Sequence, residues 1–458
     1  MKLPRFSSQS LRTLLPMLLL ASAPAALAQD AAAAAPKIDT GDNAWMLASA
    51  ALVLMMTGPG LALFYGGLVR RKNVLATMMQ SMFLMSFVSI LWFLYGYSVS
   101  FGEGGAFFGS FTQFALLKGV GGAPNADYAA TIPHQTFMLY QMMFAIITPA
   151  LITGAFAERM KFTAFLALVF GWVTFVYFPL AHMVWGKGGY FNWALGGTIP
   201  VLDFAGGTVV HISSGAAALV CAIVLGPRKG FPREPMLPHN VVLTLIGAGL
   251  LWVGWFGFNA GSALNAGTLA TSAFAATHFA GAAGGLAWSA MEWLGRGKLS
   301  VLGAASGMVA GLATITPASG FVSVSGAVLI GLAGGVGCYL CVTKVKAAFG
   351  YDDSLDVFGV HCCGSVIGML LLGGLASAEV NPAIASTFKK AGEVVSLAGG
   401  TAQFLNQAIA VAFTAILSSV VTYVLLKLIG ATIGLRVGAE EEHSGLDVSE
   451  HGESAYNE

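Results

Sequence analysis

Long apolar runs of about 20 residues, separated by short polar stretches, dominate the chain from Ala44 onward. A helix needs a run of this length to cross the hydrocarbon core of a membrane. Transmembrane β-strands would instead alternate apolar and polar residues over about 10 positions. The pattern therefore predicts an all-α polytopic membrane protein. We predict eleven transmembrane helices, over Ala44–Gly66, Val74–Val99, Thr136–Ala157, Phe162–Trp185, Phe204–Leu225, Val241–Asn259, Leu269–Trp293, Val301–Thr316, Phe321–Val345, Val357–Ala376 and Thr401–Ile429.

The composition agrees with this pattern. Of the 458 residues, 56% are hydrophobic and only 9% are charged, whereas a soluble domain carries about 25% charged residues. So few charges would not cover the surface of a water-soluble globule of this size, which excludes a soluble enzyme. The net charge of +1 gives no indication of nucleic-acid binding. The 59 glycines predict helices that pack closely through small residues.

The first 28 residues have the pattern of a secretory signal peptide. Basic residues precede an apolar core at Leu14–Leu20, and Ala26-Leu27-Ala28 matches the small-residue cleavage pattern. We predict cleavage after Ala28, which leaves residues 29–43 as a periplasmic linker. An uncleaved anchor is the alternative.

An exported N-terminus and an odd number of spans place the two ends of the chain on opposite sides of the membrane. The loops that then face the cytoplasm hold most of the basic residues, as the positive-inside rule expects. We therefore predict a multi-pass protein of a bacterial inner membrane with a periplasmic N-terminus. Its transmembrane domain covers residues 44–435, and residues 436–458 form a cytoplasmic C-terminal tail.

Two predicted spans begin with the same spacing of an aspartate and a histidine. Asp203 precedes His211 by eight residues, and Asp353 precedes His361 by eight residues. Five spans separate the two segments, so the segments cross in opposite directions, as in inverted-topology repeats. We predict two inverted five-helix repeats plus a final helix. Eight helical residues rise about 12 Å, so in a core of about 30 Å the two histidines lie close enough in depth for their imidazoles to touch.

Several interpretations of this pair stay open. Ionisable groups inside a membrane are functional by default, which favours a functional site. The alternative is that the two histidines are structural core residues, each hydrogen-bonded to a neighbouring helix. A zinc site lacks a third ligand, and a bis-histidine haem is a competitor. Asp is also a favoured helix N-cap. For Asp203, a structural cap and a group that attracts cations are therefore equally supported interpretations. Asp352, Asp353 and Asp356 are predicted to cap the tenth span, with some role in an inner vestibule.

A second group of side chains lies on the third and sixth spans, which run in opposite directions. Tyr140 is then level with Ser262 near the outer side, and Phe144 shares a deeper layer with Phe258. Trp185 ends the fourth span on the outer side. An aromatic cluster with one hydroxyl suits a small cation, and two phenyl rings below it would form a dry constriction. Core packing or an interfacial aromatic belt is the alternative for each ring.

The inventory of charges favours a neutral permeant. No Lys, Arg, Asp or Glu has to lie in the central half of a predicted span. A strongly hydrated ion would need compensating oxygens or charges there, and no potassium-filter motif is present. The outer aromatic cluster would attract a cation, the passage below it is hydrophobic, and the histidine pair can take up a proton. Together these features predict that the cation loses a proton before it passes.

These segments resemble the signatures of the ammonium transporter (Amt) family. The resemblance covers essentially the whole mature chain. It differs at one point, because Cys362-Cys363 follows the second histidine where the family usually has a glycine. The matching segments are Ala62-Leu63-Phe64-Tyr65-Gly66-Gly67, Ala181-His182-Met183-Val184-Trp185-Gly186, Asp203 to His211, Gly257-Phe258-Asn259-Ala260-Gly261-Ser262, Asp356 to His361, and the tail from Gly445 to Glu453.

The resemblance implies a homotrimer with one pore per subunit and no cofactor. It also implies regulation by a PII-type signalling protein at the cytoplasmic face, within nitrogen metabolism. By residue match, it assigns Trp185, Ser262, Tyr140 and Asp203 to ammonium recruitment, Phe144 and Phe258 to a gate, and His211 and His361 to a proton relay.

Chemistry then gives a hypothesis for selectivity. Ammonium and potassium have similar sizes, but only ammonium can give up a proton. We expect ammonia and a proton to move separately, which makes uptake electrogenic. The alternatives are a passive ammonia channel, an ammonium sensor and, more remotely, a bis-histidine membrane cytochrome.

Overall fold

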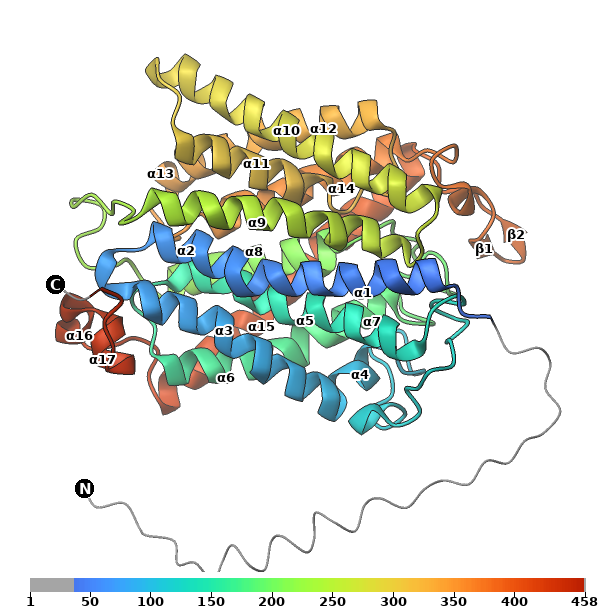
Figure 1. The fold of residues 1–458 in the computed structure, drawn as a ribbon, viewed down its shortest axis with the longest axis horizontal. Helices are drawn as coiled ribbons and strands as arrows, with labels where there is room; N and C mark the ends of the chain where they lie inside the picture. Colours follow the sequence, from blue (N-terminus) through green and yellow to red (C-terminus); the bar gives the residue numbers. More distant parts are fainter. Residues whose placement is uncertain (1–36, 457–458) are drawn as a thin grey trace, which may run out of the picture. The chain divides into compact units, whose positions relative to one another are not determined.

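The predicted apolar runs fold as helices, and most of these helices run in nearly the same or the opposite direction (Figure 1). The computed structural model describes residues 37–456, so the predicted signal peptide and its cleavage after Ala28 lie outside the described residues. The α-helices and strands of the described part are α1 (Thr40–Met55), α2 (Ala62–Leu68), α3 (Val74–Leu91), α4 (Tyr97–Phe101), α5 (His134–Phe156), α6 (Phe162–Trp172), α7 (Phe178–Trp185), α8 (Ser213–Leu225), α9 (Val241–Ala260), α10 (Thr268–Arg296), α11 (Val301–Ile315), α12 (Val324–Leu340), α13 (Lys346–Phe349), α14 (Cys363–Leu375), α15 (Thr401–Thr432), α16 (Ala439–Ser444), α17 (Leu446–His451), β1 (Lys389–Lys390) and β2 (Glu393–Val394).

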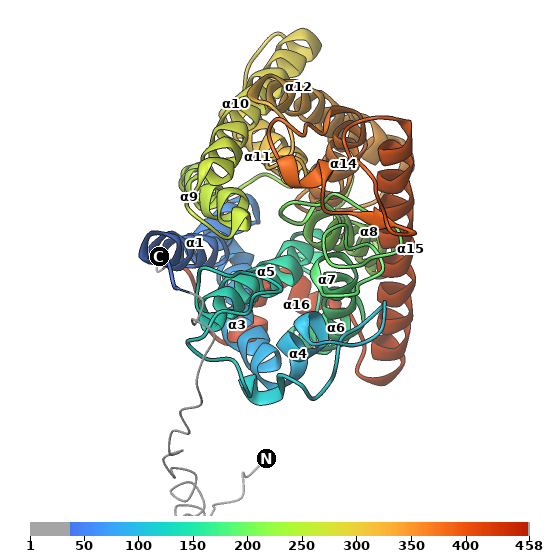
Figure 2. The ribbon, with the colours of Figure 1, turned by 90° about the vertical axis from the view of Figure 1, so that its right-hand side faces the viewer.

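Most of these helices are viewed end-on in Figure 2, where α15 is seen lengthwise along one side. α15 contacts α6, α8 and α14. The two short strands pair antiparallel as a hairpin in the segment between α14 and α15.

Nine helices of residues 37–456 are long and apolar enough to cross a membrane. Two further predicted spans are helical but fall outside this set. Small residues dominate α10, which lowers its hydropathy, and α11 has only 15 residues. The structure therefore supports a helical multi-pass membrane fold, and the count of eleven stays a prediction. The nine helices are Thr40–Leu68, Arg71–Phe101, His134–Phe156, Phe162–Trp185, Gly207–Leu225, Val241–Ala263, Val324–Phe349, Phe358–Leu375 and Thr401–Thr432.

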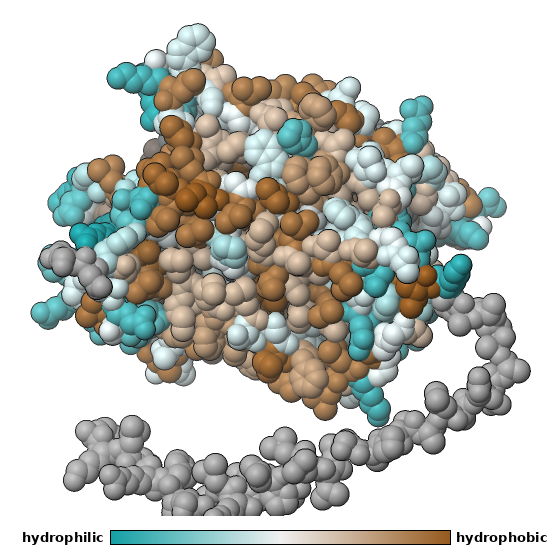
Figure 3. Space-filling model, viewed as in Figure 1, coloured by the Kyte–Doolittle hydropathy of each residue, from teal (hydrophilic) through white to brown (hydrophobic). Residues whose placement is uncertain are grey.

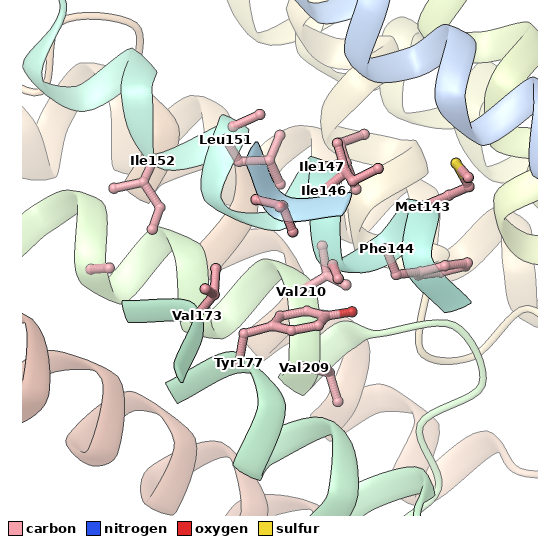
Figure 4. Packing of buried hydrophobic residues seen from close by; sticks show 14 of the residues in the cluster. Met143, Phe144, Ile146, Ile147, Leu151, Ile152, Val173, Tyr177, Val209 and Val210 are labelled. Carbon is pink, nitrogen blue, oxygen red and sulfur yellow. The ribbon is translucent and has the colours of Figure 1, made fainter. Parts of the chain in front are cut away.

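The surface and the interior both fit this fold. Hydrophobic residues cover the middle of the visible face, and hydrophilic residues gather toward the ends of the helices (Figure 3). Inside, α5 is the most enclosed of the nine helices, with 83% of its apolar window buried. Residues 143–152 of α5 pack against Val173, Tyr177 and Val210 (Figure 4). This part of the interior is apolar, so an ionisable group beside it is a candidate for function.

Two π-helical turns position the histidines. The turn η6 (Gly207–Ile212) continues into α8, and the turn η9 (Phe358–Cys362) continues into α14. The first carries His211 and the second carries His361. A π turn has one more residue per hydrogen-bonded loop than an α-helix and recurs at functional sites. The same local structure thus occurs at both positions where the sequence repeats its Asp-to-His spacing.

The segment after α15 folds back against the ends of other helices. The Asp447 carboxylate accepts a hydrogen bond from the N–H of Ala76 in the first turn of α3, at 2.8 Å. The Glu450 carboxylate accepts one from the N–H of Phe162 at the start of α6, at 3.0 Å. Because the N-terminus of a helix carries a partial positive charge, both carboxylates stabilise these ends. The tail is therefore joined to the first turns of two apolar helices.

Candidate functional site

The two histidines meet in the interior. Their Nδ1 atoms are 3.1 Å apart, and their rings are nearly parallel, with centroids 5.1 Å apart and an interplanar angle of 10°. His211 is 1% exposed and His361 is 5% exposed. The spacing argument predicted this contact. One Nδ1 must donate and the other accept, so the two rings cannot both carry a proton on Nδ1 in this arrangement.

Asp203 supports the turn that carries His211. Its carboxylate accepts hydrogen bonds from the N–H groups of Gly206, Gly207 and Thr208 at 2.8, 2.7 and 2.7 Å, and also from the Thr208 hydroxyl. The side chain is 3% exposed. Since both oxygens are engaged, the geometry favours the capping interpretation of Asp203 over direct contact with a cation. Its backbone oxygen also accepts a hydrogen bond from the Trp185 indole.

The three aspartates predicted to cap the tenth span behave differently from one another. Asp353 does cap it, because its Oδ2 accepts a hydrogen bond from the N–H of Phe358 at 2.7 Å. Asp352 instead binds Arg228, and Asp356 binds Lys346 at 2.6 Å. The expectation that all three cap this span is therefore wrong for Asp352 and Asp356, whose carboxylates are used by cations from other parts of the chain.

Asp353 and Asp352 differ in charge environment as well as in partner. Burial raises the pKa of Asp353 to about 6, and its Oδ1 atom is buried without a hydrogen-bond partner in the described structure. Burial also opposes ionisation of Asp352, but its hydrogen bonds with Arg228 outweigh that effect and hold its pKa below the usual range. The contrast shows that two adjacent carboxylates can serve different purposes.

A small cavity of about 10 Å³ adjoins the histidine pair, and we call it the central cavity. Both histidines line it together with Trp255, Phe258 and aliphatic side chains, and no Lys, Arg, Asp or Glu of the described residues lines it. The Trp255 ring stacks on His211 at 5.7 Å, and its indole donates to Thr316 at 2.9 Å. The Nε2 atom of His211 is buried without a partner among the described atoms. The cavity has room for about one water-sized molecule.

A series of rings leads from Trp185 to the histidines. The centroids of Trp185 and Phe144 are 6.0 Å apart. Phe144 and Phe258 follow at 4.3 Å, and each is 1% exposed. Phe258 in turn lies 5.9 Å from His211. The two phenyl rings therefore lie in one layer, as the opposite directions of α5 and α9 predicted, and they close the way to the central cavity.

On the far side of the phenyl rings lies a cavity of about 190 Å³, which we call the Ser262 cavity. Trp185, Phe144 and Ser262 line it, but Tyr140 does not. Tyr140 is fully buried, and its hydroxyl lies 3.1 Å from the Ser262 hydroxyl and 2.8 Å from the Phe258 carbonyl. Tyr140 is thus placed to hold Ser262 rather than to contact a ligand.

A third cavity of about 340 Å³ lies beyond the histidines, and we call it the Arg228 cavity. His361 lines both this cavity and the central cavity. Arg228, Lys346 and Asp356 also line it. The three cavities are therefore consecutive, and the only ionisable side chains beside the central one, in the part described, are the two histidines.

The sequence patterns missed several lining residues. Gln141 and Asp127 line the Ser262 cavity, and Arg228 lines the third cavity. Gln141 is the only one with a visible signal, since it is a polar residue next to Tyr140 within an apolar run. Asp127 and Arg228 lie in loops, and no periodic pattern indicates where a loop folds.

The sequence between residues 44 and 456 matches that of the Ammonium Transporter Family. The chain belongs to this family. The ammonium transporter of Bacillus subtilis is 46% identical over 418 residues, which cover 91% of this chain and 99% of the relative. Such coverage makes the family apply to the whole fold rather than to one segment.

Solved structures agree with this membership. Mep2 of Saccharomyces cerevisiae is 34% identical, with a TM-score of 0.79, and the match covers 88% of this chain and 89% of Mep2. A solved protein named Sensor Amt Protein is 27% identical, also with a TM-score of 0.79, and the match covers 90% of this chain and 98% of that protein. The proteins similar to this chain thus include a relative named as an ammonium transporter and a solved protein named for sensing.

Cys362, at the position where the resemblance implies a glycine, does not keep His361 from its contact with His211. Gly215 of α8 faces it, and a Cβ at Gly215 would lie only 2.6 Å from the Cβ of Cys362. The small residue that this close packing needs is therefore Gly215 on α8, and not the residue after His361.

The contact between His211 and His361 also argues against a haem. The two rings already touch, and the adjoining cavity of about 10 Å³ has no room for a macrocycle.

Proposed function

We propose that this protein transports ammonium across a bacterial inner membrane, taking ammonium from the Ser262 cavity and passing ammonia along the histidine pair. The main observation in support of this proposal is the order of the three cavities along one path. A small apolar cavity, bordered by His211 and His361, separates two larger ones whose linings include charged side chains. Such a passage suits a small molecule that enters as a cation and crosses as a neutral species.

Recruitment takes place at the Ser262 cavity. Aromatic faces attract cations, and Trp185 and Phe144 supply them there, while the Ser262 oxygen accepts a hydrogen bond from ammonium. Asp203 supports this site indirectly, because its backbone holds the Trp185 indole. Tyr140 supports it by holding Ser262. Both residues therefore belong to the recruitment site as positioning residues, which hold the side chains that contact ammonium.

Phe144 and Phe258 form the gate. Ammonium loses its proton with a pKa near that of lysine, about 10, so deprotonation at neutral pH needs help. Removing water disfavours the charged form, and the two rings exclude water from the central cavity. Potassium has a similar size but no proton to give, so the passage rejects it.

His211 and His361 accept and relay the proton. A neutral imidazole has one ring nitrogen that can accept a proton and one N–H that can give a proton up, and the Nδ1–Nδ1 hydrogen bond joins the two rings into one path. The unpartnered Nε2 of His211 supplies the acceptor on the gate side. When ammonia and the proton both reach the other side, each cycle moves one positive charge, so transport is electrogenic.

The remaining features follow from the family and the charge distribution. We propose eleven spans, with α10 and α11 completing the set, arranged as two inverted repeats plus α15. The basic Arg70-Arg71-Lys72 segment and Arg228 support a cytoplasmic position for the Arg228 cavity. The N-terminus is then periplasmic after signal-peptide cleavage. The active form is a homotrimer, and a PII-type protein binds its cytoplasmic face.

Current measurement tests the proposal. Purified protein in proteoliposomes on a solid-supported membrane should give a transient positive current after an ammonium jump and none after a potassium jump. His211→Ala and His361→Ala should lose the current or lose selectivity against potassium. Cys221→Ser, a buried change in α8 outside the three cavities, is the control and should keep the current. Uptake of ammonia without current would defeat the electrogenic mechanism.

Two other functions give different outcomes in the same assay. A passive ammonia channel would alkalinise the vesicle interior with no current. An ammonium sensor, which the similarity to the Sensor Amt Protein keeps in view, would bind ammonium at the Ser262 cavity with neither current nor flux. Tryptophan fluorescence, monitored at Trp185 against a Trp185→Phe variant, reports that binding.

A further inference from the structure

Gln141 is a polar residue of α5 that the proposed transport steps do not use. Phe137, Gln141 and Phe144 all line the Ser262 cavity, and their spacing of four and three residues places them along one face of the helix. Further along α5, Ile147 lines the central cavity. The helix therefore runs from one cavity to the other. Gln141 lies on the outer side of the Phe144 gate, with a rise of about 4.5 Å between the two residues.

Three other polar side chains in the wall of this cavity already have partners. The Tyr128 hydroxyl donates to the Phe101 carbonyl at 2.7 Å and accepts from the backbone N–H of Lys187 at 3.1 Å. The Asn192 side chain donates to one backbone carbonyl and accepts from two backbone N–H groups, each at 2.8 Å. The Asp127 carboxylate binds the ammonium group of Lys187 at 2.9 Å. These three side chains are therefore engaged within the protein.

Gln141 and Ser262 differ from these side chains, because each has an oxygen that can still accept a hydrogen bond. Within residues 37–456, no hydrogen bond uses the amide of Gln141, which is half-buried. The Ser262 hydroxyl donates its hydrogen to the Phe258 carbonyl at 2.9 Å, so its oxygen faces the cavity as an acceptor. A polar group that is removed from water without a new partner is costly. The free amide of Gln141 is therefore better explained by a ligand than by packing.

We propose that the amide oxygen of Gln141 is a second hydrogen-bond acceptor for ammonium in the Ser262 cavity, an inference that rests on the proposed function. Ammonium has four N–H donors and no acceptor, so its partners have to be oxygen lone pairs and aromatic faces. Ser262 and Gln141 supply the oxygens, and Trp185 and Phe144 supply the faces. Together they replace part of the water shell that ammonium loses on entering the cavity.

A neutral acceptor suits this place because the ammonium bound there has to move on. Conduction needs binding that is strong enough for entry and weak enough for departure. Hydrogen bonds to ionised groups are stronger than those to neutral groups, so a carboxylate at position 141 would hold the cation in front of the gate. An amide attracts the same N–H groups without a full charge. Gln141 should therefore set the affinity for ammonium while allowing rapid turnover.

Two substitutions with opposite expected effects test this role. Gln141→Met keeps an unbranched side chain but removes the amide, so it should raise the KM for ammonium about fivefold, the effect of one lost hydrogen bond, with little change in the maximal current. Gln141→Glu should lower the KM and also lower the maximal current, by about twofold or more. Gln80→Met is the matched control, because it makes the same change at a buried glutamine of α3 that lines none of the three cavities.

Two measurements separate binding from transport. Ammonium-evoked currents of proteoliposomes on a solid-supported membrane give the KM and the maximal current. Tryptophan fluorescence of the same proteins, titrated with ammonium chloride, gives the dissociation constant without any need for transport. The midpoint of thermal unfolding of each variant reports whether the substitution changes the stability of the fold.

The expected result is weaker binding in Gln141→Met, tighter binding with slower transport in Gln141→Glu, and wild-type values in Gln80→Met. Wild-type affinity in Gln141→Met overturns the proposal, and a lowered thermal midpoint with that affinity assigns the residue a structural role only. If Gln141→Met does not fold, Gln141→Glu decides, since a carboxylate tightens binding only when it lies close to the bound cation. If the wild type binds ammonium but carries no current, the proposed function fails, while the titration still decides the role of Gln141.

Discussion

The indole nitrogen of Trp185 donates a hydrogen bond to the backbone oxygen of Asp203 at 3.1 Å. The carboxylate of the same aspartate holds the first N–H groups of η6, the turn that carries His211. One residue therefore connects the aromatic wall of the Ser262 cavity with the histidine pair. The geometry of recruitment and the geometry of the relay depend on each other through Asp203.

Replacing Asp203 should show this dependence as a loss of stability. Asp203→Ala removes a cap that accepts three N–H groups, so we expect a loss of about 2 kcal/mol, the upper end of the range for helix caps. Asp203→Asn keeps one oxygen acceptor and should lose less. The midpoint of thermal unfolding in detergent measures both. Equal midpoints for the wild type and the alanine variant would show that the cap contributes nothing.

Tyr140 and Ser262 should act on affinity through one shared contact. Ser262→Ala removes the hydroxyl that lines the cavity, and Tyr140→Phe removes only the group 3.1 Å away that holds it. A hydrogen bond contributes about 1 kcal/mol, so each change should raise the KM for ammonium about fivefold. The double variant should be no worse than Ser262→Ala. Multiplied effects in the double variant would mean that Tyr140 acts independently.

Asp353 should make stability depend on pH. Its folded pKa of about 6 lies above the unfolded value of about 3.9, so its charge destabilises the folded protein. That penalty is absent below pH 4, grows as the pH rises toward 6, and is complete above 6, where it amounts to about 3 kcal/mol. Besides burial, the charged groups that act on this carboxylate are Lys346, which lowers its pKa, and Asp356, which raises its pKa.

The variant Asp353→Asn isolates this effect, because the amide oxygen still accepts from Phe358 but carries no charge. Its thermal midpoint should exceed that of the wild type at pH 7.5, and the advantage should shrink as the pH falls to 4.5. Thermal unfolding of both proteins across this pH range measures the difference. A constant offset at every pH would contradict the predicted ionisation.

The buried pair of Arg228 and Asp352 should be costly to break on one side only. Their nitrogen and oxygen atoms are 2.8 Å apart, and the two side chains are 5% and 0% exposed. Asp352→Asn leaves a buried arginine without this partner and should cost about 3 kcal/mol. The double variant Arg228→Met with Asp352→Leu should recover much of that loss.

An exposed ion pair of the same molecule is the control for this comparison. Lys187 and Asp127 are 2.9 Å apart, but both side chains are 43% exposed. Asp127→Asn should therefore cost far less stability than Asp352→Asn, as changes to surface pairs do. Thermal unfolding in detergent compares all these variants. Similar losses for the buried and the exposed change would show that burial does not decide the effect.

The candidate site was partly visible in the sequence because helices have a fixed rise. The repeated spacing from Asp203 to His211 and from Asp353 to His361 predicted that the two histidines lie close in depth, and their Nδ1 atoms are 3.1 Å apart. The opposite directions of two spans placed Phe144 with Phe258, whose rings are 4.3 Å apart. These predictions succeeded because regular helices convert sequence spacing into depth.

Other parts of the site were beyond the sequence. Nothing in the pattern shows that Tyr140 is fully buried behind Ser262, since depth along a helix does not fix which side of it faces a cavity. The pairing of Asp352 with Arg228 spans 124 residues of chain. It depends on how a loop returns to the helix ends, which no local periodicity records.

By itself, the sequence determined that this is a helical membrane protein of the ammonium transporter family with two matched histidines. Apolar length, helical rise and charge scarcity act along the chain, so they can be read from it. Only the tertiary structure decided which side chains line the three cavities and that Asp203 acts as a cap. Those facts arise from the rotation of each helix about its axis and from the packing of distant segments, and packing is a property of the folded chain as a whole.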